Sequence, residues 1–401
     1  MPAHHSPTNS FSRGWLLIGI LAIATTLRVT FTGIAPLLGT LGNDLQLTTA
    51  QTGILTTLPL IAFAIFSPLA AGVARRLSTE RALAVALLMI IAGIFLRSSG
   101  TSSALYIGTA TIGCGIALGN VLLPSLIKRD FSDNVARLTG AYSLTMGVAA
   151  ALGSVAMVPL ALWGLGWRGA LLCLMAFPVL ALVLWLPQLT RPRQGLPGNS
   201  PALNQRGIWR SALAWQVTFF LGLNSLVYYV VIGWLPSILV SQGFTSTEAG
   251  SLHGLMQLST AAPGLIIGLV LGRLKDQRGV AASVSILCAI SALGLWLMPA
   301  LASLWVVLFG FGSGATMILG LTFIGLRASS AHQAAALSGM AQSVGYLLAA
   351  FGPPLMGMLH DVTGHWAAPL AAVALLAILM AVAGACAGRD REIIVAQPER
   401  A

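Results

Sequence analysis

Long apolar segments alternate with short polar or charged breaks along nearly the whole chain. About 20 apolar residues are enough to cross the hydrocarbon core of a bilayer as a helix. The pattern therefore predicts twelve transmembrane helices. They cover residues 15–40, 48–72, 82–97, 104–127, 136–160, 168–187, 211–238, 246–271, 280–299, 302–326, 335–358 and 366–387.

The apolar segments are continuous, as in LLCLMAFPVLALVLWL at residues 171–186. A membrane β-barrel would alternate apolar and polar residues in segments of about ten, so a barrel is excluded. Hydrophobic residues make up 57% of the chain and charged residues 8%. A soluble enzyme and a disordered chain are excluded as well, because so few polar residues cannot cover a soluble surface. We predict an all-α membrane protein.

The chain divides into two six-helix halves that repeat. Residues 1–187 form the N-terminal half, 209–401 the C-terminal half, and the proline-rich, basic segment 188–208 the linker. At an offset of 199 the pairs that coincide are Gly113 and Gly312, Gly115 and Gly314, Gly140 and Gly339, Gly153 and Gly352, and Trp167 and Trp366. Thr48 with Gln51, and Thr245 with Glu248, fit capping boxes that open corresponding helices. These coincidences indicate a parallel duplication.

The distribution of basic residues predicts the orientation in the membrane. Of the 21 Lys and Arg residues, 18 fall on the side that holds both termini, and Arg97 and Arg168 fall on the other. Loops rich in Lys and Arg remain in the cytoplasm. We expect an inner-membrane protein of a bacterium, acting as a monomer, with both termini cytoplasmic.

Motifs for other chemistry are missing from the sequence. The four cysteines lie in or at the end of apolar segments without CxxC or Cys/His spacing, so no metal ligand is expected. No P-loop, H-E-x-x-H or G-x-S-x-G motif occurs, and no basic cluster with interleaved aromatics suggests nucleic acid. We predict no cofactor, no nucleic-acid partner and no enzymatic activity.

Arg28 is the most informative candidate for a substrate-binding residue, since it lies near the middle of the first predicted span. A charge at that depth costs at least ~2.5–3.5 kcal/mol on insertion scales. No Asp or Glu lies at the midplane of any predicted span, so a transported anion or electron-rich solute is a fitting partner. The alternative is a permanent bond to backbone carbonyls and to hydroxyls such as that of Thr32.

Other polar side chains could contact a substrate or could simply bond one helix to another. His253 and Gln257 are four residues apart on one helix face, and His253 could carry a proton or be a neutral residue bonded to a neighbouring helix. Tyr228 is the repeat mate of Arg28. The remaining candidates are Asn120, Tyr142, Asn224, Gln342 and Tyr346.

Three passages resemble the cyanate and 2-nitroimidazole porter family of the major facilitator superfamily. They are GIALGNVLLPSLIKRDF from Gly115, AWQVTFFLGLNSLVYYVVIGWLP from Ala214, and ALSGMAQSVGYLLAAFGPPLMG from Ala336. The superfamily's loop signature G-x-x-x-D-R-x-G is degraded near Arg76, where Arg75 and Ser78 replace its Asp and second Gly. The copy with Gly272, Asp276 and Gly279 is better preserved, so these residues and Arg76 are candidates for a gating latch.

The resemblance implies the major facilitator fold and alternating access around a central cavity. It also implies a small, flat, anionic or electron-rich substrate anchored by Arg28. We expect a secondary transporter that exports compounds like 2-nitroimidazole, with protons as a candidate coupling ion. One alternative is an importer of a small anion such as cyanate. Another is a membrane sensor that binds a solute without moving it, although the linker is too short to be a soluble output domain.

Overall fold

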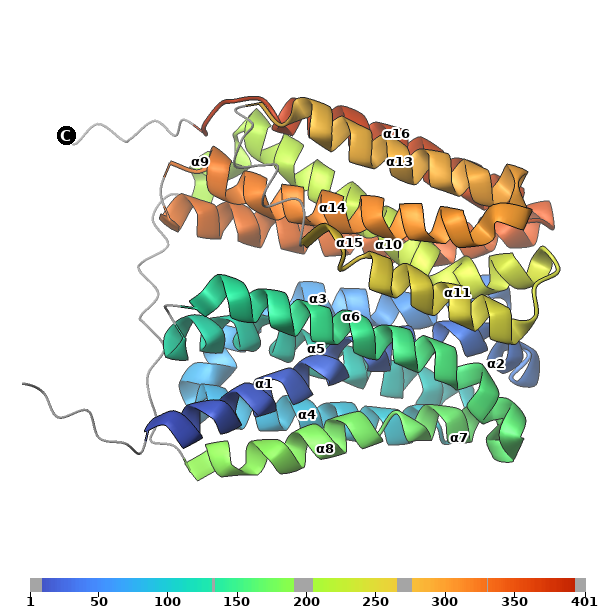
Figure 1. Cartoon of the computed structure of the whole chain (residues 1–401), viewed down its shortest axis with the longest axis horizontal. Helices are drawn as coiled ribbons and strands as arrows, with labels where there is room; N and C mark the ends of the chain where they lie inside the picture. The colour runs from blue at the N-terminus through green and yellow to red at the C-terminus, as the bar shows by residue number, and fades with distance from the viewer. Residues whose placement is uncertain (1–8, 132–133, 191–204, 265–275, 330, 394–401) are drawn as a thin grey trace, which may run out of the picture.

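In the computed structural model of the chain, the described residues are 9–131, 134–190, 205–264, 276–329 and 331–393, and no strand occurs among them. The all-α fold class is confirmed (Figure 1). The helices before the linker are α1 (Asn9–Thr32), the short turn η1 (Ala35–Leu37), α2 (Leu38–Asp44), α3 (Thr49–Leu77), α4 (Thr79–Arg97), α5 (Ser102–Asp130), α6 (Val135–Leu160), η3 (Ala161–Leu165), α7 (Gly166–Cys173), α8 (Ala176–Trp185) and η4 (Leu186–Thr190).

The helices after the linker follow the same plan. They are α9 (Gln205–Trp209), α10 (Ala212–Ser241), α11 (Ser246–Ser259), α13 (Arg278–Leu297), η5 (Pro299–Leu301), α14 (Ala302–Arg327), α15 (Ala331–Thr363) and α16 (Ala367–Ala387). Within the described residues, nine segments are long and apolar enough to cross a membrane, and one of them, 137–190, contains two predicted spans. The eighth and eleventh predicted spans, which are not among the nine, coincide with α11 and α15.

Prolines interrupt three of the predicted spans. A proline has no N–H to donate to the carbonyl four residues earlier, so a helix ends or kinks there. The first span is therefore not one helix over 15–40: α1 ends at Thr32 before Pro36, and a short turn leads into α2. Pro178 follows the break between α7 and α8, and Pro263 follows the end of α11. The remainder of the eighth span, beyond residue 264, lies outside the described residues.

The helices form two groups that lie side by side (Figure 1). In the first group α4 packs on α5, α3 on α5, and α1 on α6. In the second group α10 packs on α15 and α13 on α16. The largest contacts between the groups are those of α3 with α15 and of α6 with α11, and η1 and α3 also touch α10. The boundaries of the two halves at residues 187 and 208 remain a prediction.

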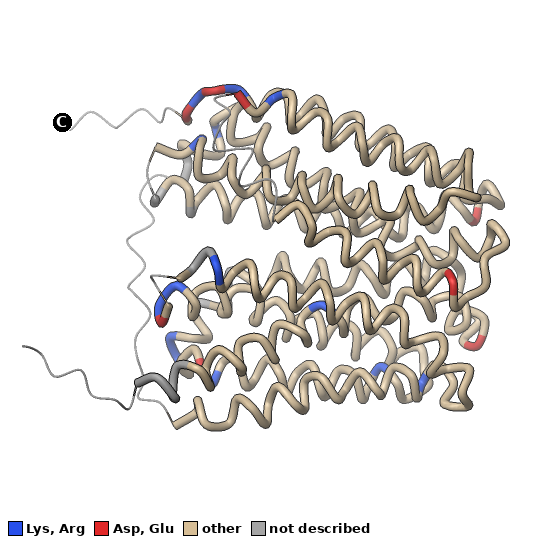
Figure 2. Tube along the Cα trace, viewed as in Figure 1, with Lys and Arg blue, Asp and Glu red and all other residues tan. Residues whose placement is uncertain are grey.

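The two ends of the bundle differ in charge (Figure 2). The end at which α3 and α5 finish carries most of the Lys and Arg residues, and we call it the basic end. At the other end α3 and α11 begin with the two predicted capping boxes, which are both confirmed. Thr48 accepts from the N–H of Gln51 and Thr245 from that of Glu248, while the Gln51 and Glu248 side chains bond back to the caps.

Candidate functional site

The Arg28 side chain lies between the two groups of helices. Its Nη2 donates to the hydroxyl of Tyr228 on α10 and, at 3.4 Å, to Oε1 of Gln257 on α11. The Tyr228 hydroxyl donates to the same Gln257 oxygen at 2.9 Å. The guanidinium carbon is 5.4 Å from the centre of the Tyr228 ring, a cation–π distance. Three of the predicted candidates therefore meet, with no carboxylate between them.

This cluster has more hydrogen-bond donors than acceptors. The described residues give a partner only to Nη2 of Arg28, so Nε and Nη1 have no acceptor among them. Nε2 of Gln257 is buried and has no partner within the described part of the chain. Nε and an Nη group form the edge that binds a planar acceptor with two parallel bonds. The site can accommodate an acceptor that brings its own negative charge.

Aromatic rings surround the Arg28 cluster. Tyr229 packs edge to face on Phe31 with ring centres 5.5 Å apart, and Tyr228 packs on Tyr229 at 5.3 Å. From α15, Tyr346 contacts Phe63 at 5.4 Å and Tyr229 at 6.5 Å. These flat faces suit a flat solute, because edge-to-face and offset contacts with rings are favourable.

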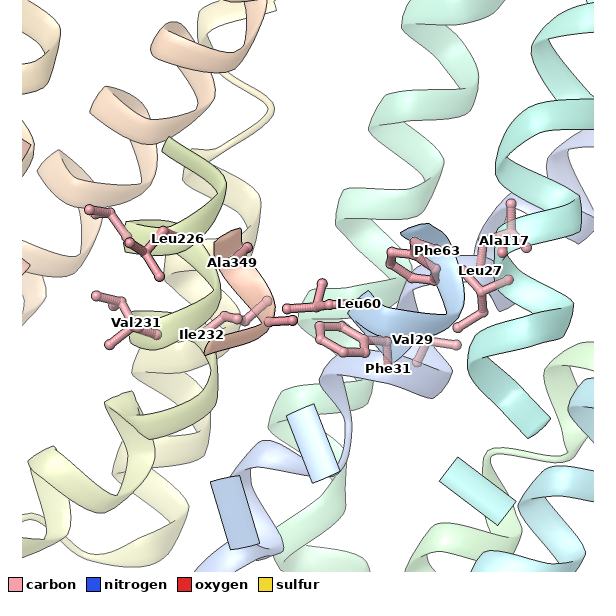
Figure 3. Close-up of a cluster of buried hydrophobic side chains, with 14 of the residues drawn as sticks. Leu27, Val29, Phe31, Leu60, Phe63, Ala117, Leu226, Val231, Ile232 and Ala349 are labelled. Atoms are coloured by element: carbon pink, nitrogen blue, oxygen red, sulfur yellow. The ribbon is translucent and has the colours of Figure 1, made fainter. Parts of the chain in front are cut away.

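Apolar side chains also meet between the two groups of helices. Leu60 and Phe31 of the first group face Ile232 and Ala349 of the second (Figure 3). All four are buried. The contact between the two groups is therefore apolar at these four residues.

Other predicted candidates lie at different distances from Arg28. Tyr142 on α6 is half-buried and close enough to interact electrostatically with the guanidinium. Gln342 is exposed one turn before Tyr346 and donates to Ser338 at 2.9 Å. Asn120 is half-buried on α5, and the described residues offer its side chain no hydrogen bond.

Two candidates make the bonds that a purely structural role would require. The Thr32 hydroxyl donates at 3.1 Å to the backbone carbonyl of Arg28, and it is not bonded to the guanidinium. Asn224 is buried and accepts at 3.2 Å from the hydroxyl of Ser313 on α14. Asn224 thus joins two helices of one group.

His253 is fully buried and bonds to both groups. Its Nε2 is 2.9 Å from the carbonyl oxygen of Ile232 on α10, and its Nδ1 is 2.9 Å from Oγ of Ser154 on α6. Sequence reasoning did not single out Ser154. The available signal was its place beside Gly153, on a helix face rich in small residues.

Close contacts between the groups cluster at the end where α3 and α11 begin, which we call the closed end. A Cβ at Gly53 would lie 2.9 Å from the carbonyl oxygen of Pro353, and one at Gly254 would lie 2.9 Å from that of Ala151. Asp361 accepts a hydrogen bond from the N–H of Ala50 at 3.1 Å. Small residues allow the backbones to approach this closely.

At the basic end, each group has an arginine at the end of one helix that is bonded to the start of another, half-buried in the first group and buried in the second. Arg129 pairs with Glu80 at 2.5 Å in the first group. In the second, Arg327 donates to Oε1 of Gln277 at 2.6 Å and to the carbonyl of Ala387 at 3.0 Å. Sequence reasoning missed these pairs, because basic residues near span ends were interpreted only as orientation signals.

The candidate latch residues lie at the basic end or outside the described residues. Arg76 is exposed in the last turn of α3, and Gly279 is exposed near the start of α13. Asp276 pairs with Arg278 at 2.6 Å. Hydrogen bonds from the side chain and backbone N–H of Arg278 hold the pKa of Asp276 below its usual range. Gly272 lies outside the described residues.

Within the described residues, no group of three His, Cys, Asp or Glu side chains is placed to hold a metal ion. The chemistry that the arrangement offers is recognition: a cation with a free edge, an uncharged donor and flat aromatic faces.

Known proteins with similar sequences and folds identify the family. The chain is 69% identical to the 2-nitroimidazole transporter of Escherichia coli (strain K12), over 94% of this chain and 96% of the relative. It is 25% identical to the cyanate transport protein CynX of the same organism, over 88% and 91%. The crystal structure of a D-xylose–proton symporter superposes with a TM-score of 0.77 at 13% identity, covering 92% of this chain and 96% of that one.

The family model described as Major Facilitator Superfamily matches residues 17–350. Members of this family are membrane transporters and not enzymes. The predicted fold class and resemblance are therefore confirmed, and the protein is an integral membrane transporter. The chain belongs to the Major Facilitator Superfamily.

Proposed function

We propose that the protein is a secondary transporter that exports small, flat, anionic or electron-rich solutes such as 2-nitroimidazole by alternating access. The observation that carries this proposal is the free edge of Arg28, with Nε and Nη1 unbonded among the described residues and aromatic rings around it. A nitro or carboxylate group has two oxygens in one plane, which match the guanidinium fork.

The positions of the inter-group contacts support alternating access. The described hydrogen bonds between the groups lie from the level of Arg28 to the closed end, as in the bonds of Ala50 with Asp361 and of His253 with Ser154. Rocking of the two groups about the Arg28 level would break these bonds and open the closed end. The groups then correspond to the halves 1–187 and 209–401, joined by the linker 188–208.

The charge distribution supports the orientation. Lys and Arg concentrate at the basic end, and the cytoplasmic loops of membrane proteins carry such an excess. The protein then lies in the bacterial inner membrane as a monomer, with both termini in the cytoplasm and its closed end toward the outside. In this conformation the substrate site faces the cytoplasm, as loading of an exporter requires.

The printed names of relatives support the substrate class. The chain is 69% identical to a 2-nitroimidazole transporter, which favours a flat nitro compound. The more distant relative is a cyanate transport protein, so import of a small anion is the second candidate. Cells that make the protein should accumulate less 2-nitroimidazole than cells that lack it. Greater accumulation would reverse the direction, and binding without movement in proteoliposomes would indicate a sensor.

The experiment that tests the site uses Arg28→Lys and Arg28→Ala. Lysine keeps the charge and loses the planar fork, so Arg28→Lys should weaken 2-nitroimidazole binding about 10- to 100-fold, as expected for a charge-assisted bond of ~1.5–3 kcal/mol. Arg28→Ala should fold, because its desolvation cost is removed with the charge, and should lose the ligand-induced rise in melting temperature.

The matched control is Arg97→Lys. Arg97 is a second buried arginine of the first group, and it bonds to the backbone carbonyl of Thr30 at 3.0 Å. This variant should melt earlier and keep its response to ligand. A well-folded Arg28→Ala protein that binds 2-nitroimidazole and cyanate as the unmodified protein does would refute the site.

A further inference from the structure

A proline determines which nitrogen of His253 carries a permanent hydrogen. Pro236 lies within α10 and has no N–H, so the carbonyl of Ile232, four residues earlier, has no helical partner. Nε2 of His253 lies 2.9 Å from that carbonyl oxygen. A carbonyl only accepts, so Nε2 carries a hydrogen and donates it. Nδ1 is therefore the nitrogen that can gain or lose a proton.

The partner of Nδ1 accommodates both protonation states. Oγ of Ser154 is 2.9 Å from Nδ1 and 2.8 Å from the carbonyl oxygen of Ala150. When His253 is neutral, the Ser154 hydroxyl donates to Nδ1. When His253 is protonated, Nδ1 donates to Oγ and the hydroxyl turns to the Ala150 carbonyl. No heavy atom has to move between the two states.

The bond between His253 and Ser154 also crosses between the groups. A Cβ at Gly250 would lie 3.1 Å from the carbonyl oxygen of Ser154, so α6 and α11 are packed too tightly for water to enter. Both side chains are fully buried. Moving α6 away from α11 would uncover Nδ1, while the bond from Nε2 to Ile232 stays within the second group.

Among the described residues, the charged side chain that acts on His253 electrostatically is Arg28 on α1. The titratable side chains that act on Arg28 are Tyr228 and Tyr229 of α10 and Tyr142 of α6. The sequences of α1, α6 and α10 contain no Asp or Glu, and Glu248 of α11 is exposed and caps its own helix. A proton on His253 is thus opposed by the charge of Arg28.

An anion bound to Arg28 would neutralise the guanidinium charge, and it would thereby reduce the repulsion between Arg28 and a proton on His253. By linkage, if the anion favours the proton, the proton favours the anion to the same extent. We infer that His253, with Ser154, is a proton-binding site of the transport cycle, and that one proton moves in the same direction as each anionic substrate. A more acidic exterior would drive this coupled movement inward, which is the direction of the second candidate function, the import of a small anion. The proton binds the lone pair of Nδ1 from the water on one side and leaves to the water on the other. This inference rests on the proposed function of Arg28.

The test measures how many protons the purified protein takes up when it binds 2-nitroimidazole. Calorimetric titrations in buffers of different ionisation enthalpy give this number at mildly alkaline pH, where free histidine is neutral. His253→Gln should take up about one proton fewer per bound ligand than the unmodified protein. Its amide can still donate to Ile232. Ionisation of the ligand itself cancels in the difference, and equal uptake by both proteins would overturn the inference.

The matched control is His365→Gln, which changes an exposed histidine at the closed end and should leave proton uptake unaltered. In proteoliposomes, an acidic exterior should drive accumulation of 2-nitroimidazole by the unmodified protein and by His365→Gln. In His253→Gln the initial rate should no longer depend on the pH gradient. An unchanged dependence in His253→Gln would contradict a proton on this residue.

A measurement on the unmodified protein does not depend on the folding of any variant. With ¹⁵N-labelled histidine, the buried His253 is recognised in NMR spectra by its protection from a water-soluble paramagnetic agent. Addition of 2-nitroimidazole should shift its Nδ1 resonance toward the protonated position, and an unmoved resonance would overturn the inference. Failure of the proposed substrate site would be seen separately, as undiminished ligand binding by Arg28→Ala.

Discussion

The hydroxyl of Thr57 on α3 donates a hydrogen bond of 2.6 Å to the carbonyl oxygen of Ala350 on α15. That carbonyl is available because Pro354, four residues later within α15, has no N–H to bond to it. The same reasoning explains the bond between His253 and Ile232, where Pro236 provides the free carbonyl. Prolines in the second group therefore create acceptors that polar side chains fill, one of them across the interface.

Thr57→Val should shift the protein toward opening of the closed end. The substitution keeps the shape and leaves the buried Ala350 carbonyl without its donor, which costs ~1–3 kcal/mol in the closed conformation. Spin labels at Ser99 and Ser246, in a cysteine-free background, would report the separation of the two groups at this end. Thr111→Val is the control, because the Thr111 hydroxyl bonds only to its own helix at Ile107. Equal distances in the two variants would contradict a closing role for Thr57.

Lowering the pH should weaken the contacts between the groups at the closed end, because it protonates Asp361. This residue lies just beyond the eleventh predicted span. Partial burial acts to raise the pKa of Asp361, but hydrogen bonds from Thr49, the N–H of Ala50 and His360 outweigh it and lower the pKa. The contribution of a carboxylate with a lowered pKa is present above its ordinary pKa and lost as the pH falls through the lowered value. The distance between the labels should therefore increase in acid.

In Asp361→Ala the Ala50 bond is missing at every pH. The label distance in this variant should already be long at neutral pH, and it should respond less to acid than that of the unmodified protein. A variant with the full acid response would show that another group controls the opening of this end.

The bonds of the two arginines at the basic end lead us to expect different losses of stability for Glu80→Gln and Arg129→Ala. Arg327 bonds to the neutral Gln277 in the second group, while Arg129 bonds to Glu80 in the first. Arg129 also pairs with Asp130 at 2.8 Å. In Glu80→Gln the guanidinium therefore keeps a carboxylate partner and the new amide oxygen can still accept from it, so the melting temperature should change little. Arg129→Ala leaves the buried Glu80 charge without its partner and should cost ~3–5 kcal/mol. Equal losses in the two variants would show that the charge of Glu80 itself is essential.

The membrane-spanning architecture could be predicted from the sequence because the bilayer requires long apolar helices and their spacing is visible in the pattern. The capping boxes at Thr48 and Thr245 were predictable for a similar reason, since a cap involves residues three positions apart. The breaks at Pro36 and Pro178 were missed, because hydrophobicity alone does not show which carbonyls lose their donors.

The sequence was sufficient to predict the residue that anchors the candidate site, but it did not reveal all of the residues around that anchor. Arg28 stood out because a charge in the middle of an apolar span needs a reason, and its repeat mate Tyr228 is in direct contact with it. Ser154 and Phe31 could not be found in this way. A serine or a phenylalanine is ordinary in a membrane helix, and only the packing of α6 against α11, or of α1 against α10, gives it a partner.

Ser78 alone connects α3 to α4. Its backbone has φ 88° and ψ 157°, a region that is nearly restricted to glycine and costs ~1–3 kcal/mol for other residues. It occupies the place where the loop signature of the superfamily has its second glycine. Its side chain offsets part of the cost by accepting from the N–H of Arg81 at 3.4 Å, as a helix cap.

Ser78→Gly should relieve the strain and lose little capping energy, since glycine at an N-cap costs only a few tenths of a kcal/mol. The net gain should be about 1 kcal/mol, seen as a higher melting temperature in detergent. Ser78→Ala keeps the strained backbone and loses the cap, so it should melt below the unmodified protein by an equivalent of ~1 kcal/mol. The two variants differ by a single methyl group. If the melting temperature rises in Ser78→Gly and falls in Ser78→Ala, the cause is backbone strain and not side-chain packing. A lower melting temperature for Ser78→Gly than for Ser78→Ala would show that the backbone at this turn is not strained.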